Sequence, residues 1–244
     1  MVSPARRATG QAMSKPKFNY QTGDGNEWAK WSWNPVTGCL HNCPYCYARD
    51  IANRYNINTH DNFEPTFHPE RLDAPKNTKI PKGRENEPGI RNVFTVSMGD
   101  LFGDWVPLNW IDQVFQMIQE NPQWNFILLT KNPRRYFDFE FPPNCWIGAT
   151  ADTQERADIA LDVFGKLNVP NIKFLSCEPL SEFIWLKHLR FNWLIIGGRS
   201  RSTGMPVMQP KWEWVESLLR QARKFDIPVY FKPNLLVRPR EFPK

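Results

Sequence analysis

The residues with the clearest chemical potential in this sequence are three cysteines, Cys39, Cys43 and Cys46. They are spaced C-x3-C-x2-C in the stretch GCLHNCPYCYA. Five cysteines is an odd number, and no apolar segment follows the basic N-terminus to make it a secretory signal. A disulfide framework is therefore disfavoured and a cytoplasmic location is expected. Three cysteines flanked by Gly, His, Asn and Pro do not resemble buried core either, which leaves metal chemistry.

Two metal centres compete for this loop. Zinc would take His41 as a fourth ligand, but structural zinc usually joins two ligand pairs from separate parts of the chain. No second pair of this kind is found elsewhere in the sequence. The alternative is a [4Fe–4S] cluster, since thiolates suit iron–sulfur chemistry and one short loop can hold three corners of a cube. The fourth iron would then be open to chelation by a small molecule.

The elements that must position this loop follow a regular alternation. Short apolar runs, rich in β-branched and aromatic residues, predict buried strands. Amphipathic stretches between them predict helices. The predicted strands are 31–37, 92–97, 125–130, 145–150, 172–177, 193–197 and 228–232, and the predicted helices are 44–56, 108–120, 153–167 and 211–225, with short helical turns after Pro133 and Ser181.

This alternation predicts an α/β fold with right-handed crossovers and a mainly parallel sheet. We expect an incomplete (β/α) barrel of six to seven mainly parallel strands, with a doubly wound open sheet as the alternative. Residues 1–27 are expected to be a disordered or loosely attached lead, and 28–244 a single domain. The segment 58–91, rich in Pro, Lys and Asn, is expected to pass over the barrel mouth.

Polar residues follow nearly every predicted strand, at the end where chemistry collects in parallel α/β folds. Some of them could be helix caps, but a ring of such residues around one mouth indicates a site. The stretches are SMGD at 97–100, TKN at 130–132, TAD at 150–152, SCEP at 176–179, GGRS at 197–200, and Lys232.

Charge and hydropathy set wider limits. The formal net charge of +6 and the pI of about 9.1 favour an anionic partner. No apolar run approaches the roughly 18 residues of a membrane span, so no membrane partner is expected.

The cysteine motif, with an aromatic residue directly before its last cysteine, resembles the radical S-adenosylmethionine (SAM) superfamily. The wider chain resembles a poorly characterised family of phage and prophage radical-SAM-like proteins. That second resemblance rests on WNPVTGC at 33–39, CPYCYA at 43–48, SMGDLF at 97–102, LLTKNP at 128–133, WIGAT at 146–150, SCEPL at 176–180 and IIGG at 195–198.

The resemblance implies that Cys39, Cys43 and Cys46 each bind one iron of a [4Fe–4S] cluster and that S-adenosyl-L-methionine chelates the open iron. A 5′-deoxyadenosyl radical would then abstract hydrogen from a substrate, for which a nucleic acid or nucleotide is the expected class. An electron donor such as flavodoxin or ferredoxin is also implied. Tyr45 would lie against the adenine. Asp100 stands where the superfamily often has a Gly-Gly-Glu-like segment that meets the methionyl amine.

The candidate site residues follow from the strand ends and the resemblance together. Glu178, Lys131 and Lys232 are the candidate catalytic residues. Glu178 would contact ribose hydroxyls or substrate, and Lys131 would hold a carboxylate or phosphate. The candidate cofactor-binding residues are Tyr45, Ser97, Gly99, Asp100, Thr130, Ser176 and Glu178.

A second function of another class stays open. The chain could be a non-catalytic nucleic-acid-binding module that uses zinc or an iron–sulfur cluster structurally. Neighbouring strand residues face opposite sides, so Cys177, next to Glu178, could be a hydrogen donor to a radical only if it faced the site. Cys145 begins a strand, at the opposite end from the predicted site, and is expected in the core.

Overall fold

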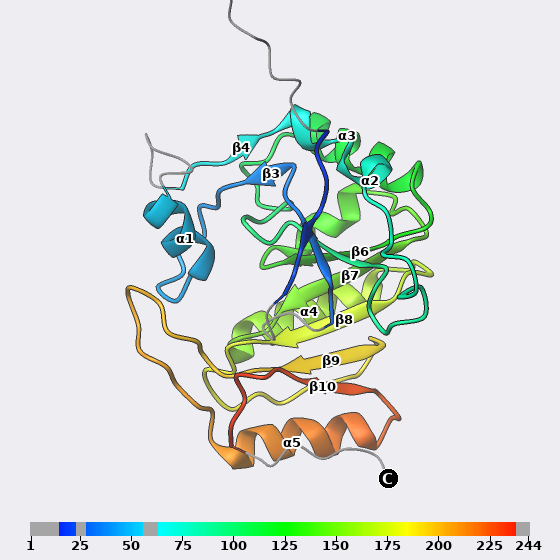
Figure 1. The fold of residues 1–244 in the computed structure, drawn as a ribbon. Coiled ribbons are helices and arrows are strands. Elements are labelled where there is room, and N and C mark those ends of the chain that lie inside the picture. The colour runs from blue at the N-terminus through cyan, green and yellow to red at the C-terminus, as the bar shows by residue number, and fades with distance from the viewer. Residues whose placement is uncertain (1–14, 23–27, 56–62, 238–244) are drawn as a thin grey trace, which may run out of the picture.

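A computed structural model describes residues 15–22, 28–55 and 63–237 (Figure 1). Ten strands and five α-helices are placed among them. The strands are β1 (Asn19–Tyr20), β2 (Trp31–Trp33), β3 (Val36–Thr37), β4 (Thr66–Phe67), β5 (Asn92–Thr95), β6 (Asn125–Thr130), β7 (Cys145–Thr150), β8 (Lys173–Cys177), β9 (Trp193–Ile196) and β10 (Val229–Phe231). The helices are α1 (Tyr47–Tyr55), α2 (Ala74–Asn77), α3 (Leu108–Gln119), α4 (Gln154–Lys166) and α5 (Trp212–Arg223), with 3-10 helices η2 (Pro69–Arg71) and η3 (Pro133–Asp138).

Eight strands form one sheet in the order β1-β2-β5-β6-β7-β8-β9-β10. All neighbours from β2 to β10 are parallel, and β1 pairs with β2 antiparallel. The predicted α/β class with a mainly parallel sheet is therefore confirmed. A doubly wound sheet reverses its strand order at one point, and this sheet does not, so that alternative is wrong. Its edge strands β1 and β10 do not pair with each other, and the sheet is open.

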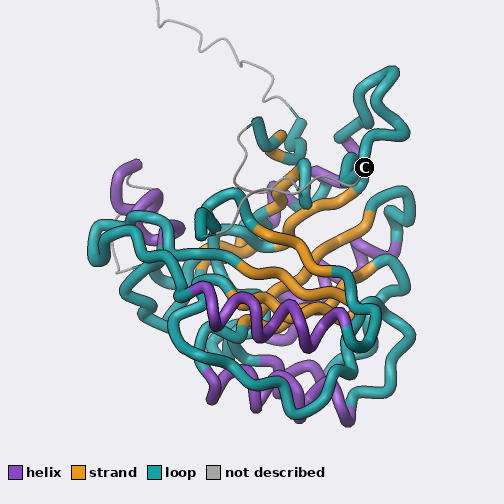
Figure 2. The backbone as a smooth tube through the Cα atoms, turned by 90° about the horizontal axis from the view of Figure 1, so that it is seen from below, coloured by secondary structure: helices purple, strands orange, loops and turns teal. Residues whose placement is uncertain are grey.

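The two faces of the sheet bury different material. Alternate residues such as Phe126, Leu128, Leu175 and Leu194 pack with apolar residues of α3, α4 and α5 in the main core. Figure 2 shows these helices along one side of the strands. The opposite face carries a smaller, largely aromatic cluster of Trp28, Phe94, Ile127, Phe174 and Ile195 with Leu129, Trp146, Trp193 and Tyr230 at its edge. That inner cluster lies on the face that also carries the candidate site.

The helices begin and end near the predicted positions, for local reasons. Thr153 caps α4, since its hydroxyl accepts a hydrogen bond from the Arg156 N–H at 3.3 Å. Pro107 precedes α3, whose Ile111, Val114 and Ile118 are fully buried. A 3-10 helix, η3, follows Asn132 as expected, whereas residues 181–190 contain no helix, so the helical turn predicted after Ser181 is wrong.

The predicted strand 31–37 is two strands. Pro35 has no N–H to donate and cannot continue a ladder, so β2 ends before it. The Asn34 side chain takes over by accepting the Met98 N–H at 2.9 Å. Beyond this break β3 pairs antiparallel with β4, which brings the following cysteine loop across the carboxyl end of the sheet.

Two predictions about segments need correction. Within the predicted loose lead, Phe18 is buried and β1 joins the sheet, because Phe18 packs against Trp31, Trp33 and Trp124. Residues 1–14 and 23–27 lie outside the described residues. Of the segment 58–91, residues 58–62 also lie outside them. Most of the remainder packs away from the cavity described below, as where the Trp124 Nε1–H donates to the Pro75 carbonyl, so the predicted cover over the mouth is wrong there.

None of the helices in the described part of the chain combines the length and the apolar character that crossing a bilayer requires.

Candidate functional site

All the residues predicted for the site line one cavity of about 440 Å³ at the carboxyl ends of the parallel strands. In the segment 63–91, Phe63 alone contributes to its wall. The predicted residues in the wall are Cys39, Cys43, Tyr45, Cys46, Ser97, Gly99, Asp100, Thr130, Lys131, Ser176, Glu178 and Lys232.

The cysteine loop is anchored through its backbone. Gly38 has φ +87°, a conformation that side chains disfavour, and its N–H donates to the Met98 carbonyl at 2.9 Å. Gly99 pairs with Gly38 in an isolated parallel bridge, and a Cβ at Gly99 would lie 2.8 Å from the Gly38 carbonyl oxygen. The glycines therefore permit the close approach that carries the loop from the first strand across the end of β5.

The three loop cysteines are half-buried free thiols. Burial raises the pKa of Cys39 to about 12, against a hydrogen bond from the His41 backbone, and the charges of Asp100, Cys43 and Cys46 raise it further. Three thiolates in this loop would repel one another unless a cation lay between them. A bound metal would stabilise the deprotonated ligands.

A single metal ion and a cube require different arrangements. Among residues 15–22, 28–55 and 63–237, no three His, Cys, Asp or Glu side chains converge as they would around one ion. A [4Fe–4S] cluster binds each thiolate through a different iron, so its ligands need not converge on one point. Cys39, Cys43 and Cys46 line one cavity, and are the residues that could hold such a cluster.

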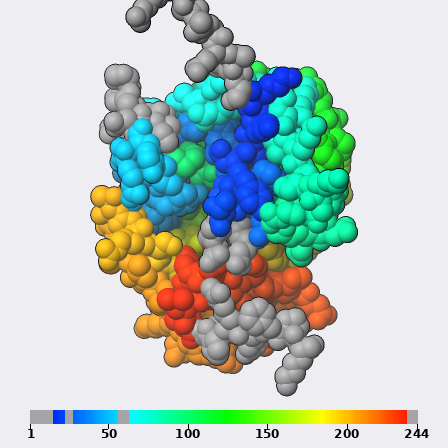
Figure 3. Space-filling view, viewed as in Figure 1, coloured from blue at the N-terminus to red at the C-terminus, as the bar shows by residue number. Residues whose placement is uncertain are grey.

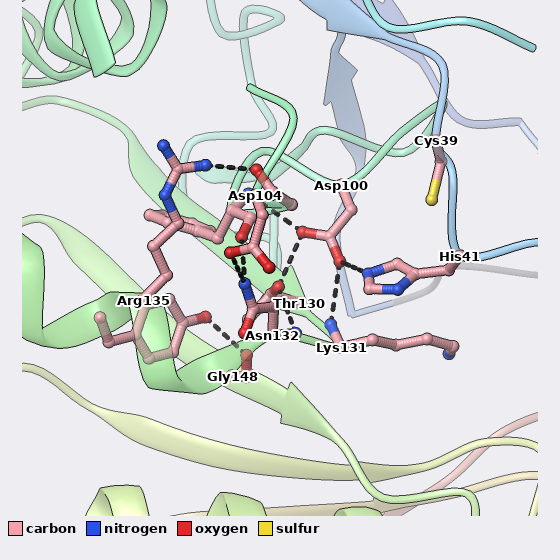
Figure 4. Close-up of polar contacts among 12 residues, drawn as sticks. Cys39, His41, Asp100, Asp104, Thr130, Lys131, Asn132, Arg135 and Gly148 are labelled. Atoms are coloured by element: carbon pink, nitrogen blue, oxygen red, sulfur yellow. Dashed lines mark hydrogen bonds and ion pairs between the residues drawn. The ribbon is translucent and has the colours of Figure 1, made fainter. Parts of the chain in front are cut away.

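Asp100 joins the cysteine loop to the sheet (Figure 4). One of its oxygens accepts from Thr130 Oγ1 at 2.7 Å and the Phe102 N–H at 3.0 Å. The other accepts from the Lys131 N–H at 2.9 Å and pairs with His41 Nε2 at 2.8 Å. Burial opposes ionisation, but these donors outweigh it and lower the pKa of Asp100. His41, weighed above as a zinc ligand, is thus held by a carboxylate.

Tyr45 belongs to a second buried polar group. Its hydroxyl donates to Asp152, whose two oxygens also bind Arg156 Nη1 at 2.6 and 2.7 Å. Lys131 Nζ lies 5.5 Å from the centre of the Tyr45 ring. Burial favours the protonated form of Asp152, but Lys131, Arg156 and Tyr45 outweigh it and lower the pKa of Asp152. The aromatic residue of the motif is therefore fixed in orientation at the cavity wall.

A third polar group lies where β8 and β10 end. Lys232 Nζ pairs with a Glu178 oxygen at 3.1 Å. The Asn234 amide donates to the other Glu178 oxygen at 3.3 Å and to the Gly198 carbonyl at 2.8 Å. Ser176 is buried in the same cavity wall.

The two cysteines outside the loop do not line the cavity. Cys145 and Cys177 are fully buried in the helix-side core.

Sequence reasoning missed several residues of the wall. Trp28 precedes the first predicted strand and carries no strand-end signal, yet its ring belongs to the inner cluster and to the cavity. Tyr47 donates its hydroxyl to the Ser97 carbonyl at 2.7 Å. Arg201, by contrast, lies on the loop after β9, GGRSRSTG at 197–204, whose backbone donors and two arginines already indicate from the sequence a loop that could bind an anion. That loop crosses to α1, where the Thr203 N–H donates to Asp50 at 2.6 Å, and Figure 3 shows it (orange) directly below α1 (light blue).

Comparison with known proteins gives one match. The model of a family described as "Protein of unknown function (DUF5131)" matches residues 24–234. No curated protein and no solved structure matches the chain. The matched residues include the whole of the cavity wall described above.

Proposed function

The chain belongs to the family described as "Protein of unknown function (DUF5131)", and because that description leaves the activity open, we propose from the site that the protein is a radical S-adenosylmethionine enzyme. The observation that carries the proposal is the placement of three motif cysteines in one cavity with the polar ends of the parallel strands. The resemblance of the cysteine motif to the superfamily supports it.

The fold supports the proposal through its winding. The parallel strands follow one another in unbroken order, the helices pack on one face, and the cavity lies on the other face at the carboxyl ends. We interpret this sheet as a partial barrel of the radical-SAM kind. A cavity at that end of the strands is where loops converge in (β/α) barrels.

Cys39, Cys43 and Cys46 would hold the cluster, and S-adenosyl-L-methionine would occupy its open iron. When bound, these two cofactors supply reductive cleavage of a carbon–sulfur bond and a carbon radical that abstracts hydrogen. A small reducing protein such as flavodoxin or ferredoxin would provide the electron.

The chain's own residues hold and shield this chemistry. Asp100 fixes the cysteine loop through His41, and Asp152 fixes the Tyr45 ring. Thiols donate hydrogen to carbon radicals readily, and the one thiol at a cavity-forming strand end, Cys177, points to the opposite face of the sheet. The aromatic inner cluster closes the cavity below. The protein thus orients the reactants and excludes competing hydrogen donors.

Anaerobic reconstitution tests the proposal. We expect the chain to bind about four iron and four sulfide, and to cleave S-adenosyl-L-methionine to 5′-deoxyadenosine and methionine under dithionite. Cys43→Ala is expected to abolish both iron binding and cleavage, because it removes one of three ligands. The matched control is Cys145→Ala, which removes a core cysteine outside the cavity and should leave the iron content unchanged.

The alternative module gives a different result in the same experiment. A structural zinc site would bind one zinc, remain colourless and cleave nothing. Cleavage at the normal rate by Cys43→Ala would show that the ligand assignment is wrong.

A further inference from the structure

The indole N–H of Trp28 is a buried donor in the cavity wall. Trp28 is 7% exposed, and its Nε1–H has no hydrogen-bond acceptor among the residues that the structure describes. Its ring is packed at 5.0 Å from Phe94 and 6.2 Å from Trp193, so it cannot readily turn the N–H elsewhere. Buried donors in folded proteins are nearly always hydrogen-bonded. An unpaired one on a residue that lines a cavity therefore indicates a ligand acceptor, which reaches this N–H once the side chains that cover it move.

A charged pair lies beside this donor. Lys232 Nζ is 5.8 Å from the centre of the Trp28 ring and pairs with Glu178. The Asn234 amide holds Glu178 from the other side. A Cβ at Gly197 would lie 2.9 Å from Glu178 Cγ, so a glycine is needed where Glu178 packs. Trp28, Lys232 and Glu178, which we name the Trp28 subsite, thus present two donors next to a carboxylate acceptor.

The rim of the cavity above this subsite is basic. Asn234 also donates to Ser200 Oγ at 3.1 Å, and the next residue, Arg201, is exposed at the cavity wall. Arg201 has no hydrogen-bond or ion-pair partner in the described part of the chain. Arg199 also lines the cavity, with its Nε–H donated to the Pro206 carbonyl at 3.0 Å. A ligand that reaches the Trp28 subsite can therefore place an anionic group against a guanidinium.

We infer that the Trp28 subsite binds a nucleobase, with the attached phosphate toward Arg201. A base edge presents a hydrogen-bond acceptor next to a donor, which matches the indole N–H and ammonium beside the Glu178 carboxylate. Its flat faces suit an aromatic wall. A bare phosphate would meet the Glu178 carboxylate, and an apolar group would leave the Trp28 N–H unpaired. The base could belong to a free nucleotide or to a single strand.

That this base is the substrate rests on the proposed function, whereas its binding does not. Binding is measured by calorimetry on the full chain, reconstituted and unreconstituted, with the four ribonucleoside 5′-monophosphates, a short single-stranded oligonucleotide and ribose 5-phosphate. We expect at least one base-containing probe to bind about tenfold more tightly than ribose 5-phosphate. Equal binding of ribose 5-phosphate would overturn the inference. Tighter binding of the oligonucleotide than of the monophosphates would identify a strand as the source of the base.

Trp28→Phe removes the N–H and keeps an aromatic ring. We expect it to weaken nucleotide binding about tenfold. Trp193→Phe, in the same aromatic cluster but outside the cavity wall, should change binding less than about twofold and controls for damage to the cluster. Equal effects of the two substitutions would overturn the inference.

Two further variants test which part of the ligand Glu178 and Arg201 contact. Glu178→Gln replaces an acceptor by a donor and should change which base is preferred. Arg201→Ala should narrow the difference in affinity between a nucleotide and its nucleoside. If Trp28→Phe weakened binding of S-adenosyl-L-methionine and left nucleotides unaffected, the subsite would belong to the cofactor and the inference would be wrong.

The two proposals fail in distinguishable ways. Nucleotide binding through Trp28 by a chain that holds no iron would support the subsite and contradict the enzymatic proposal. Iron binding and cleavage of S-adenosyl-L-methionine, with no binding of any base-containing probe, would overturn the subsite and leave the enzymatic proposal intact.

Discussion

The two ends of the cavity differ in how their polar groups are satisfied. At the cysteine-loop end, Asp100 accepts four hydrogen bonds from within the protein. At the Trp28 subsite a buried donor on a cavity-lining residue has no acceptor among the described residues, whereas the unpaired Trp105 Nε1–H, whose ring packs on His41, belongs to a residue outside the cavity wall. Saturated buried networks fix one arrangement of the chain, whereas an unsatisfied group beside a cavity leaves an interaction for a molecule that binds there. The first end is therefore built as a support for the loop, and the second as a surface for a ligand.

Asp100→Asn should disrupt the hydrogen bonds at the cysteine-loop end, and of the substitutions proposed it should lower the free energy of unfolding the most. The amide nitrogen would face two donors that now share one carboxylate oxygen. Since Asp100 is 4% exposed, we expect the free energy of unfolding to fall by about 3 kcal/mol. Urea denaturation measures this change.

The loss of unfolding free energy in Asp100→Asn is compared with the losses in Asp112→Asn and Trp28→Phe. Asp112→Asn, on the exposed face of α3, should change the free energy of unfolding by less than about 0.5 kcal/mol. Trp28→Phe should cost clearly less than Asp100→Asn, because it removes a donor that has no partner in the free protein. If Trp28→Phe destabilised the chain as strongly as Asp100→Asn, the two ends would not differ as we argue.

Asp152 provides a pH-dependent test of the same support. Its folded-state pKa lies below its ordinary value, so its ionised form stabilises the fold. The stabilisation is complete above the unfolded pKa of about 4 and is lost as pH falls through the lower folded pKa. Near neutral pH, Asp152→Asn should therefore reduce the free energy of unfolding by about 1 to 2 kcal/mol, with the difference from wild type shrinking below about pH 4.

Denaturation series at several pH values measure this difference. Asp138→Asn, at an exposed aspartate that ends η3, should show no comparable dependence. A difference that grew as the solution was acidified would have the opposite sign to the one expected, and would show that the carboxylate is not held in its charged form.

The sequence predicted the strand-end residues at both ends of the cavity better than it predicted Trp28, for a physical reason. Parallel strands bring their carboxyl ends to one edge, so polar residues after apolar runs could be placed together without knowing the fold in detail. Thr130, Ser176, Glu178 and Lys232 were found in this way. Trp28 reaches the cavity through packing in the inner cluster, which no local pattern encodes.

Contacts between distant residues were also beyond the sequence. His41 meets Asp100, 59 positions away, and no periodicity or spacing indicates that a loop histidine and a strand-end carboxylate will pair. The break at Asn34–Pro35 was written in the sequence, since proline cannot donate to a ladder. The apolar character of the whole run concealed this break. The strand β1 was missed for another reason, because two residues are too few to show an alternating pattern.

The loop after β9 connects the two ends, and loosening it should have the smallest effect. Its Thr203 N–H donates to Asp50 on α1, and Ser202 Oγ donates to the Pro44 carbonyl at 3.3 Å, while the same loop carries Arg201 at the cavity rim. Asp50→Asn keeps an acceptor but removes its charge. We expect a loss of about 0.5 kcal/mol in this exposed contact, seen as roughly twofold faster hydrogen exchange at the Thr203 amide.

The hydrogen-exchange experiment shows whether the loop after β9 only covers the cavity or also stabilises the cysteine loop. If the loop only covers the cavity, Asp50→Asn should leave exchange in the cysteine loop unchanged, as Asp112→Asn should. Faster exchange at Gly38 and Cys39, whose N–H groups are bonded to the Met98 and Phe63 carbonyls, would mean that the loop helps to hold the cysteine end. The contrast between a self-supporting end and a ligand-binding end would then be weaker than the separate hydrogen-bond networks indicate.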